Sequence, residues 1–309
     1  MSGAMRDYAD SNPGMDLLEA ARSAGLRVPE TPVEPESRIV EVNGLRLRYL
    51  DWGNGHLPDL LLLHGTAQDA HSWDFAALSL SDRFHVVALD QRGHGESEWH
   101  TGGDYGLSAY LADLEAFVEA AGLRDIVVCG LSMGGRNAYA YSASRPDRVR
   151  ALVVTEAAPR MEDPGRERVT RFVSGPREFD SFEELVAHVH AYVPERPVEQ
   201  LRGSLRHKVR RFSNGKWSWK YDPEIVRARR GPFADTEDDR WRLLAGVSCP
   251  TLFVLGERSD MISRATLDRM LDTVPGSRAE VVPDAGHLAP GDNPAGFDAA
   301  IRPFLEGLG

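Results

Sequence analysis

The 309-residue sequence has few cysteines and no surplus of positive charge. Its two cysteines, Cys129 and Cys249, lie in apolar runs and can form one disulfide at most. This count excludes a disulfide-dense scaffold and favours a reducing compartment. The 36 lysine and arginine residues are outnumbered by 47 aspartate and glutamate residues, for a net charge of -11. Because such a chain offers no uniformly basic surface to a phosphate backbone, we expect no nucleic-acid partner.

Long hydrophobic runs are also missing. No stretch is long enough to cross a bilayer, and residues 1–16 lack the cationic start and apolar stretch of a secretory signal. We therefore expect a cytoplasmic protein without a membrane partner. With 42% apolar and 27% charged residues, the chain has the composition of a globular protein that can bury a large core.

Short apolar runs alternate with helical patterns from residue 38 onward. Two alternating runs around Asn43-Gly44 predict an antiparallel hairpin, because this dipeptide favours a tight turn. Later runs are unbroken and apolar, as in strands that are covered on both faces. Between them, the segments 107–122 and 132–146 have apolar residues at the spacing of a helix. This alternation predicts an α/β fold with a mostly parallel central sheet and helices on both faces. The strand-like runs are at 59–65, 85–90, 125–130, 151–157, 251–256 and 279–283.

Two segments depart from the alternation. Residues 1–36 are polar, with one weak amphipathic helix from Asp16 to Ala24, and we interpret them as an N-terminal arm. Residues 160–240 contain helix-like pieces and aromatic residues, and 160–231 hold 16 lysine and arginine residues against 11 aspartate and glutamate residues. This basic segment predicts a helical cap inserted after the sixth strand. The core is then formed by residues 37–159 and 241–309.

A candidate nucleophile follows the run at 125–130. The sequence Gly130-Leu-Ser132-Met-Gly134 is a G-x-S-x-G motif between a predicted strand and a predicted helix. Glycines are needed on both sides because the serine sits on a strained turn where larger side chains would collide with the sheet and the helix. The helix N-terminus beside the serine also favours a negative charge nearby.

A serine hydroxyl becomes a strong nucleophile only when a base removes its proton, and that base must be oriented by a carboxylate. His287 is the candidate base, because it lies in a glycine-containing loop after the last strand-like run. Asp260, four residues after the glycine that ends 251–256, is the candidate acid. Glu156, at the end of the run at 151–157, is its rival.

These motifs resemble the alpha/beta-hydrolase fold family over roughly residues 38–309. The resemblance rests on His64-Gly65 after a buried strand, on the DQRGHGES sequence at 90–97, on the Ser132 motif and on the loops of Asp260 and His287. It implies a capped serine hydrolase whose triad has the chain order Ser132, Asp260, His287. It also implies that backbone N–H groups of Thr66 and Met133 bind the oxyanion.

Aromatic and apolar side chains are expected to line a pocket under the cap. The turn at Asn214-Gly215 predicts a hairpin with three aromatic residues on one face, which either form the wall of the pocket or pin the cap to its own helices. Trp73 either lines the pocket or packs beneath the oxyanion loop. The expected lining residues are Trp73, Trp217, Trp219, Tyr221, Met261 and Leu288.

Neither a metal nor a cofactor is expected. His188 and His190 are two residues apart, so on a helix they face different directions, and no nearby cysteine or histidine completes a set. The segment Gly93-His-Gly95 lacks the third glycine of a dinucleotide-binding loop.

The predicted function is hydrolysis of a carboxylic ester or lactone of a small, largely apolar substrate through an acyl-enzyme. A serine at position 132 argues against the dehalogenases and epoxide hydrolases of the family, which the resemblance says attack with a carboxylate. One alternative is a carbon–carbon bond hydrolase acting on dienoate-type diketones, although those enzymes commonly have a tryptophan where Leu288 stands. Another is a small-molecule receptor that retains the triad. The sequence leaves the oligomeric state open.

Overall fold

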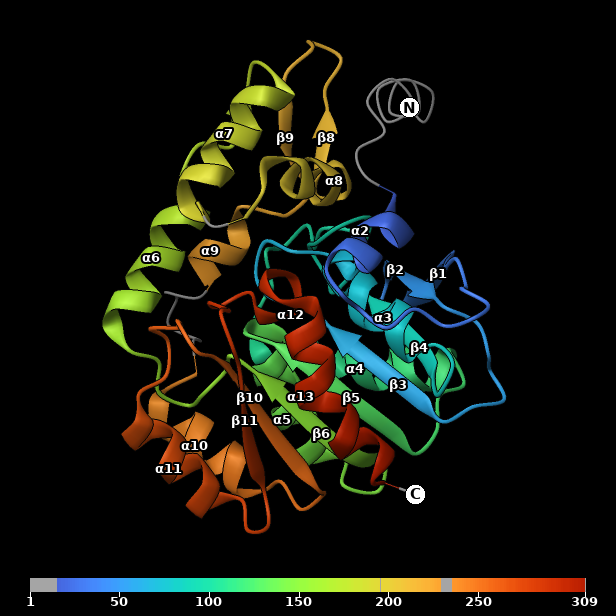
Figure 1. Ribbon diagram of the computed structural model, residues 1–309. Coiled ribbons are helices and arrows are strands. Elements are labelled where there is room, and N and C mark those ends of the chain that lie inside the picture. Colours follow the sequence, from blue (N-terminus) through green and yellow to red (C-terminus); the bar gives the residue numbers. More distant parts are fainter. Residues whose placement is uncertain (1–15, 195, 229–234, 309) are drawn as a thin grey trace.

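An eight-stranded sheet forms the centre of the molecule, in the strand order β1-β2-β4-β3-β5-β6-β10-β11 (Figure 1). The structure is a computed structural model, and it describes residues 16–194, 196–228 and 235–308. β1 and β2 are antiparallel to their neighbours, and the other neighbouring strands are parallel. The predicted α/β fold with a mostly parallel sheet is therefore confirmed. The strands are β1 (Glu36–Val42), β2 (Leu45–Asp51), β3 (Asp59–Leu63), β4 (His85–Leu89), β5 (Ile126–Leu131), β6 (Val149–Thr155), β10 (Thr251–Gly256) and β11 (Arg278–Val282).

The predicted hairpin joins β1 to β2. Asn43 and Gly44 both have positive φ angles, of 51° and 73°, as a two-residue turn with the twist of the strands requires. Val42 pairs directly with Leu45 on either side of the turn.

Helices cover both faces of the sheet. Successive strand side chains point to opposite sides, so Leu61 and Leu63 of β3 join one hydrophobic cluster while Leu60 and Leu62 join the other. The predicted helices at 107–122 and 132–146 are present as α4 and α5. The first cluster includes α4 (Leu107–Ala120), α5 (Met133–Ser144), α10 (Glu237–Ala245) and α11 (Arg264–Thr273), and the second includes α2 (Leu17–Ser23), α3 (Asp74–Leu80) and α13 (Pro294–Glu306).

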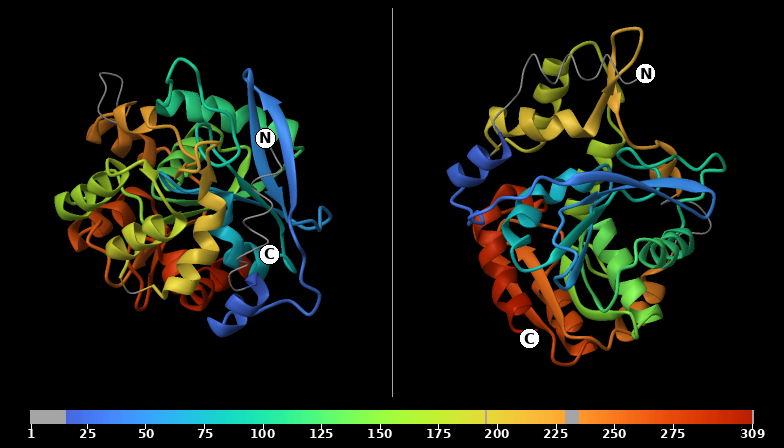
Figure 2. Two further views of the ribbon diagram at one scale, coloured as in Figure 1. Left: turned by 90° about the horizontal axis from the view of Figure 1, so that it is seen from above. Right: turned by 90° about the vertical axis from the view of Figure 1, so that its right-hand side faces the viewer.

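The chain between β6 and α10 forms an insertion that lies on one side of the core (Figure 2). It contains the helices expected of a cap, and also a small antiparallel sheet that the sequence did not predict as a whole. Two of its strands form the expected hairpin, with Gly215 at a φ of 85°, and β7 adds a third strand. The elements are α6 (Asp163–Val173), β7 (Glu178–Phe179), α7 (Phe182–Tyr192), α8 (Val198–Lys208), β8 (Val209–Arg211), β9 (Trp217–Trp219) and α9 (Glu224–Ala228).

The end of the expected cap and the expected N-terminal arm can each be compared with the helices of the structure. α10 begins at Glu237 after a capping box at Thr236 and packs against α5, so residues 237–240 lie with the core and not with the cap. The predicted helix of the arm is present as α2, which packs on α3 and buries Ala21. Residues 1–15 of the expected arm lie outside the described residues.

Ion pairs attach the insertion to the core. The Lys208 Nζ atom lies 2.8 Å from an Asp69 carboxylate oxygen and 2.7 Å from the Ser72 hydroxyl. Burial opposes ionisation of Asp69, but the Lys208 ammonium beside it holds the pKa of that carboxyl well below its usual range. Arg196 pairs with Asp292 at 2.8 Å, close to the start of α13. The insertion is thus fixed over one edge of the sheet by charges that are largely shielded from solvent.

Within the described residues, we find no helix that combines the length and apolar character needed to span a bilayer.

Candidate active site

Ser132 lies on a sharp turn between β5 and α5. Its φ and ψ angles are 54° and -113°, a strained conformation for a residue with a side chain. The Ser132 N–H donates to the Thr155 carbonyl at 2.9 Å, which fixes the turn against β6. A Cβ atom at Gly130 would collide with the backbone of Gly134, and one at Gly134 would collide with the Leu63 carbonyl. Only glycine fits on either side, so the sequence holds the serine at this turn.

His287 and Glu156 contact each other. The His287 Nδ1 atom lies 3.1 Å from the Glu156 Oε2 atom, and both side chains are buried. Because a carboxylate only accepts hydrogen bonds, Nδ1 donates to it, and in the neutral form of His287 the lone pair is then on Nε2. Glu156 also accepts hydrogen bonds from the Gly256 N–H at 2.7 Å and the Ser259 hydroxyl at 2.6 Å. Three donors compensate the burial of its charge.

The carboxylate that contacts His287 is therefore Glu156, and the expectation that Asp260 does so is wrong. Both Asp260 oxygens accept hydrogen bonds from Arg168 of the insertion, at 2.8 and 3.1 Å. The Asp260 side chain is also 38% exposed. Glu156 directly follows β6 and has a φ of 53°, and its N–H bonds to the Val254 carbonyl of β10. A strained backbone at a buried carboxylate is typical of a functional position.

A hydrogen-bonded loop after β3 lies next to Ser132. A Cβ atom at Gly65 would lie 3.4 Å from the Ser132 Cβ atom. The Gly65 N–H donates to the Gln68 side chain at 3.0 Å, and His64 Nδ1 donates to the Gly65 carbonyl at 2.8 Å. His64 Nε2 accepts from the Gln91 N–H at 3.0 Å. His64 thus shapes this loop, and both of its ring nitrogens are occupied.

The glycine-rich turn at 90–97 supports the same loop. Asp90 is fully buried and accepts hydrogen bonds from the N–H groups of Ala70 and Glu96, at 2.6 and 2.9 Å. Arg92 makes a two-point ion pair with Asp113 at 2.6 and 2.7 Å. These residues hold the turn in place.

Two buried histidines at this loop make folding stability depend on pH. Burial lowers the pKa of His64 to about 4 and that of His94 to about 3, and protons on the two neighbouring rings would also repel each other. Above about pH 4 both histidines remain neutral in the folded chain. In the unfolded chain each binds a proton below about pH 6.5, the ordinary pKa of histidine. The unfolded state then binds more protons, so stability must fall as pH falls from about 6.5 toward 4.

We expect each of these histidines to lower the free energy of unfolding by about 1.4 kcal/mol per pH unit across most of that window. Urea unfolding at pH 7.5, 6 and 5 measures the slope. In a His94→Gln variant, the free energy of unfolding should depend less steeply on pH than in the wild type, by the contribution of one histidine, about 1.4 kcal/mol per pH unit. Equal slopes would mean that His94 is protonated in the folded chain.

An apolar cavity of about 180 Å³ opens onto Ser132 and His287. The core contributes Gly65, Thr66 and Leu288 to its lining, and the insertion contributes apolar side chains from α6 and α7. Leu17 and Ala20 of α2 also line it, which the interpretation of residues 1–36 as a separate arm did not foresee. The apolar and aromatic lining from the core and insertion includes Phe75, Val169, Phe172, Val189, Tyr192 and Val193.

The expected lining residues divide between the cavity and the packing around it. Leu288 and Trp219 line the apolar cavity, whereas Met261 lines a second, more polar cavity that Ser132 and Met133 also border. Three expectations are wrong because the rings are buried elsewhere. Trp73 packs against Phe297 in the core, with ring centroids 6.0 Å apart. Trp217 packs against Phe182 at 5.3 Å, and the Tyr221 hydroxyl donates to the Val173 carbonyl at 3.3 Å, so both stabilise the insertion itself.

Comparison with known proteins places these features in one family. A family model described as alpha/beta hydrolase fold matches residues 58–294. The chain is 31% identical to esterase Rv0045c of Mycobacterium tuberculosis, over 96% of this chain and 98% of that protein. A crystal structure of that esterase superposes with a TM-score of 0.75 at 28% identity, and covers 95% of this chain and 99% of its own.

Two further relatives are named for other hydrolytic reactions. The chain is 32% identical to N-formylmaleamate deformylase of Pseudomonas putida, over 86% of this chain and 95% of that protein. A crystal structure of E-2-(acetamidomethylene)succinate hydrolase superposes with a TM-score of 0.79 at 25% identity, and covers 88% of this chain and all of its own.

Proposed function

Since the chain belongs to the alpha/beta hydrolase fold family and is a hydrolase, we propose that it is a serine esterase acting through Ser132, His287 and Glu156. The observation that carries the proposal is the contact between buried Glu156 and His287, beside a strained serine that faces the same cavity as His287. The substrate is a carboxylic ester or lactone of a small, largely apolar compound.

In the proposed mechanism, His287 transfers protons to and from Ser132 and the substrate, and Glu156 orients its ring. Glu156 fixes the His287 tautomer whose Nε2 can accept the Ser132 proton as the hydroxyl attacks a carbonyl carbon. The N–H groups of Thr66 and Met133 bind the oxyanion, since Thr66 borders the cavity and Met133 is the first residue of α5. His287 next protonates the leaving alcohol. Water then attacks the acyl-enzyme with the same base, which releases the acid and restores Ser132.

The lining of the cavity supports an apolar acyl group. Most of its lining surface is aliphatic and aromatic, although charged side chains such as Asp74, Arg196 and Lys208 also border it. The full-length similarity to an esterase supports the same reaction type. Leu288 follows His287 where the carbon–carbon bond hydrolases commonly have a tryptophan, so we rank that reaction second.

Steady-state hydrolysis of nitrophenyl esters from acetate to decanoate tests the proposal. We expect sustained turnover with an optimum at one acyl length. A single slow burst equal to the enzyme concentration would instead indicate a receptor that retains the triad. If the folded protein releases no nitrophenol, it is not an esterase for acyl groups from acetate to decanoate, and carbon–carbon bond hydrolysis is favoured.

The position of Leu17 on the cavity wall predicts a shift in that optimum. A Leu17→Trp variant narrows the cavity, so we expect kcat/KM to fall by about tenfold or more for the longest esters and to change less than about twofold for acetate. Leu18→Trp is the matched control, because Leu17 and Leu18 pack against the same core cluster but only Leu17 borders the cavity. If both variants have the same chain-length profile, α2 does not set acyl length.

A further inference from the structure

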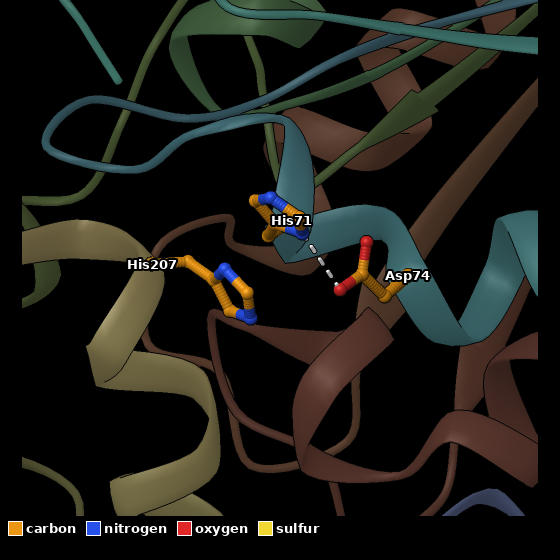
Figure 3. Close-up of side chains that lie close together, drawn as sticks. All are labelled: His71, Asp74 and His207. Atoms are coloured by element: carbon orange, nitrogen blue, oxygen red, sulfur yellow. Dashed lines mark hydrogen bonds and ion pairs between the residues drawn. The ribbon is translucent and has the colours of Figure 1, made fainter. Parts of the chain in front are cut away.

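Three side chains of the kinds that bind metal ions meet where the insertion contacts the core (Figure 3). His71 lies in the short helix η1 (Ala70–Trp73), Asp74 is the first residue of α3, and His207 lies near the end of α8. One ligand atom from each residue lies within 4.8 Å of the others. All three residues also border the apolar cavity that contains Ser132.

We propose that His71, Asp74 and His207 bind a divalent transition-metal ion of the Zn²⁺ class. Two imidazole nitrogens and one carboxylate oxygen form a ligand set that suits zinc and its neighbours, whereas magnesium and calcium require oxygen ligands. Three protein ligands leave a further coordination position for water. That position faces the cavity, because its three ligands form part of the cavity wall.

The candidate ligand atoms already lie close together. The His71 Nδ1 and Asp74 Oδ2 atoms are 3.0 Å apart, which is close to the separation of two neighbouring ligands that each lie about 2.1 Å from one zinc ion. The His71 and His207 rings stack with centroids 3.7 Å apart and an interplanar angle of 21°. Figure 3 shows the His207 ring extending from α8 toward the other two side chains. Because the lone pair of each imidazole lies in its ring plane, a bound ion requires the two rings to turn out of this stack until both planes meet at the ion.

Two arginines compete with the ion. The Arg48 Nη2 atom lies 2.9 Å from His71 Nε2, and the Arg206 Nε atom lies 3.1 Å from His207 Nε2. Arginine only donates, so His71 carries its proton on Nδ1 and donates it to Asp74. Binding at His71 Nδ1 moves that proton to Nε2 and displaces the Arg48 contact. Arg48 keeps its bonds to Asp90 and Ser37, both at 3.1 Å. The affinity is therefore lower than that of a closed structural zinc site.

The ion joins two parts of the chain that are distant in sequence. His71 and Asp74 belong to the core, and His207 lies on the insertion one residue before Lys208, which pairs with Asp69. A metal ion reinforces this connection and narrows the cavity beside Ser132. Its effect on activity rests on the proposed esterase function, whereas its binding does not.

Isothermal titration calorimetry with ZnCl₂ on the untagged, EDTA-treated and dialysed full chain tests the proposal. We expect one equivalent of Zn²⁺ to bind and Mg²⁺ to give no binding signal. His207→Ala should bind Zn²⁺ at least tenfold more weakly, and His56→Ala, which removes an exposed histidine elsewhere, should bind as the wild type does. Asp74→Asn keeps the size of the side chain and serves as the second ligand variant if His207→Ala does not fold.

Two results would overturn the proposal. One is equal zinc affinity in the His207→Ala and His56→Ala proteins. The other is loss of binding in His287→Ala, because the ion would then lie at the proposed catalytic histidine. Co²⁺ as a probe gives an independent readout, since its visible absorption should appear in the wild type and be lost in the His207→Ala protein. Each of these measurements is made without substrate, so failure of the esterase proposal leaves them interpretable.

Discussion

Replacing Ser132 with alanine should lower kcat for nitrophenyl ester hydrolysis by about 10⁴- to 10⁶-fold. The change removes the only atom that can form the acyl-enzyme in the proposed mechanism, and it leaves the strained turn and the oxyanion donors in place. The residual rate reflects the oxyanion N–H groups and substrate binding alone. Steady-state kinetics with active-site titration of the wild type measure the difference.

Ser144→Ala is the matched control. Ser144 ends the same helix α5 and donates its hydroxyl hydrogen bond to the Tyr141 carbonyl, away from the cavity. Both variants should unfold within a few degrees of the wild type, so that loss of activity cannot come from loss of structure. Hydrolysis by Ser132→Ala at a rate close to that of Ser144→Ala would exclude Ser132 as the nucleophile.

Much of the core can be predicted from the sequence because its signals are local. The strand-like runs, the Asn43-Gly44 turn and the glycines around Ser132 each specify structure within a few residues. The strain at Ser132 needs Gly130 and Gly134 nearby, so the motif itself shows where the nucleophile lies. His287 could be selected because it lies in a loop after the last strand of the sheet.

The acid could not be selected in this way, because the choice depends on the order of strands. β6 and β10 are neighbours in the sheet, so Glu156 and Asp260 both follow strands at the same edge. The backbone turn at Glu156 directs its carboxylate toward Gly256, Ser259 and His287. Asp260 is occupied by Arg168, which comes from a distant helix of the insertion. No spacing in the sequence reports that ion pair.

The contributions of the arm and the aromatic rings to the cavity were likewise not predictable. α2 packs on α3, and two of its residues, Leu17 and Ala20, border the cavity. Trp217 and Trp219 are two residues apart on β9, so the sequence pattern places both on one face. Only Trp219 borders the cavity, because Trp217 packs against Phe182 of α7. Patterns within one segment indicate that a side chain is buried, and the tertiary contacts decide which surface buries it.

Exchanging the two candidate acids for their amides should separate them by several orders of magnitude. Glu156→Gln removes the charge that stabilises protonated His287 and presents an amide that no longer requires the Nδ1–H tautomer. Loss of the orienting carboxylate in a triad costs about 10⁴-fold in kcat. KM should change little, since Glu156 acts through His287 and the described lining of the cavity does not include it.

Asp260→Asn should keep kcat within about threefold of the wild type. The change weakens the ion pair with Arg168, in which both side chains are more than a third exposed and solvent screens the charges. Glu156→Asp refines the comparison, because it restores the charge on a side chain that is one methylene too short to reach His287 and the Gly256 N–H together. We expect it to recover part of the kcat lost in Glu156→Gln. The assignment of Glu156 fails if Asp260→Asn loses the greater share of kcat, or if Glu156→Gln raises KM and leaves kcat intact.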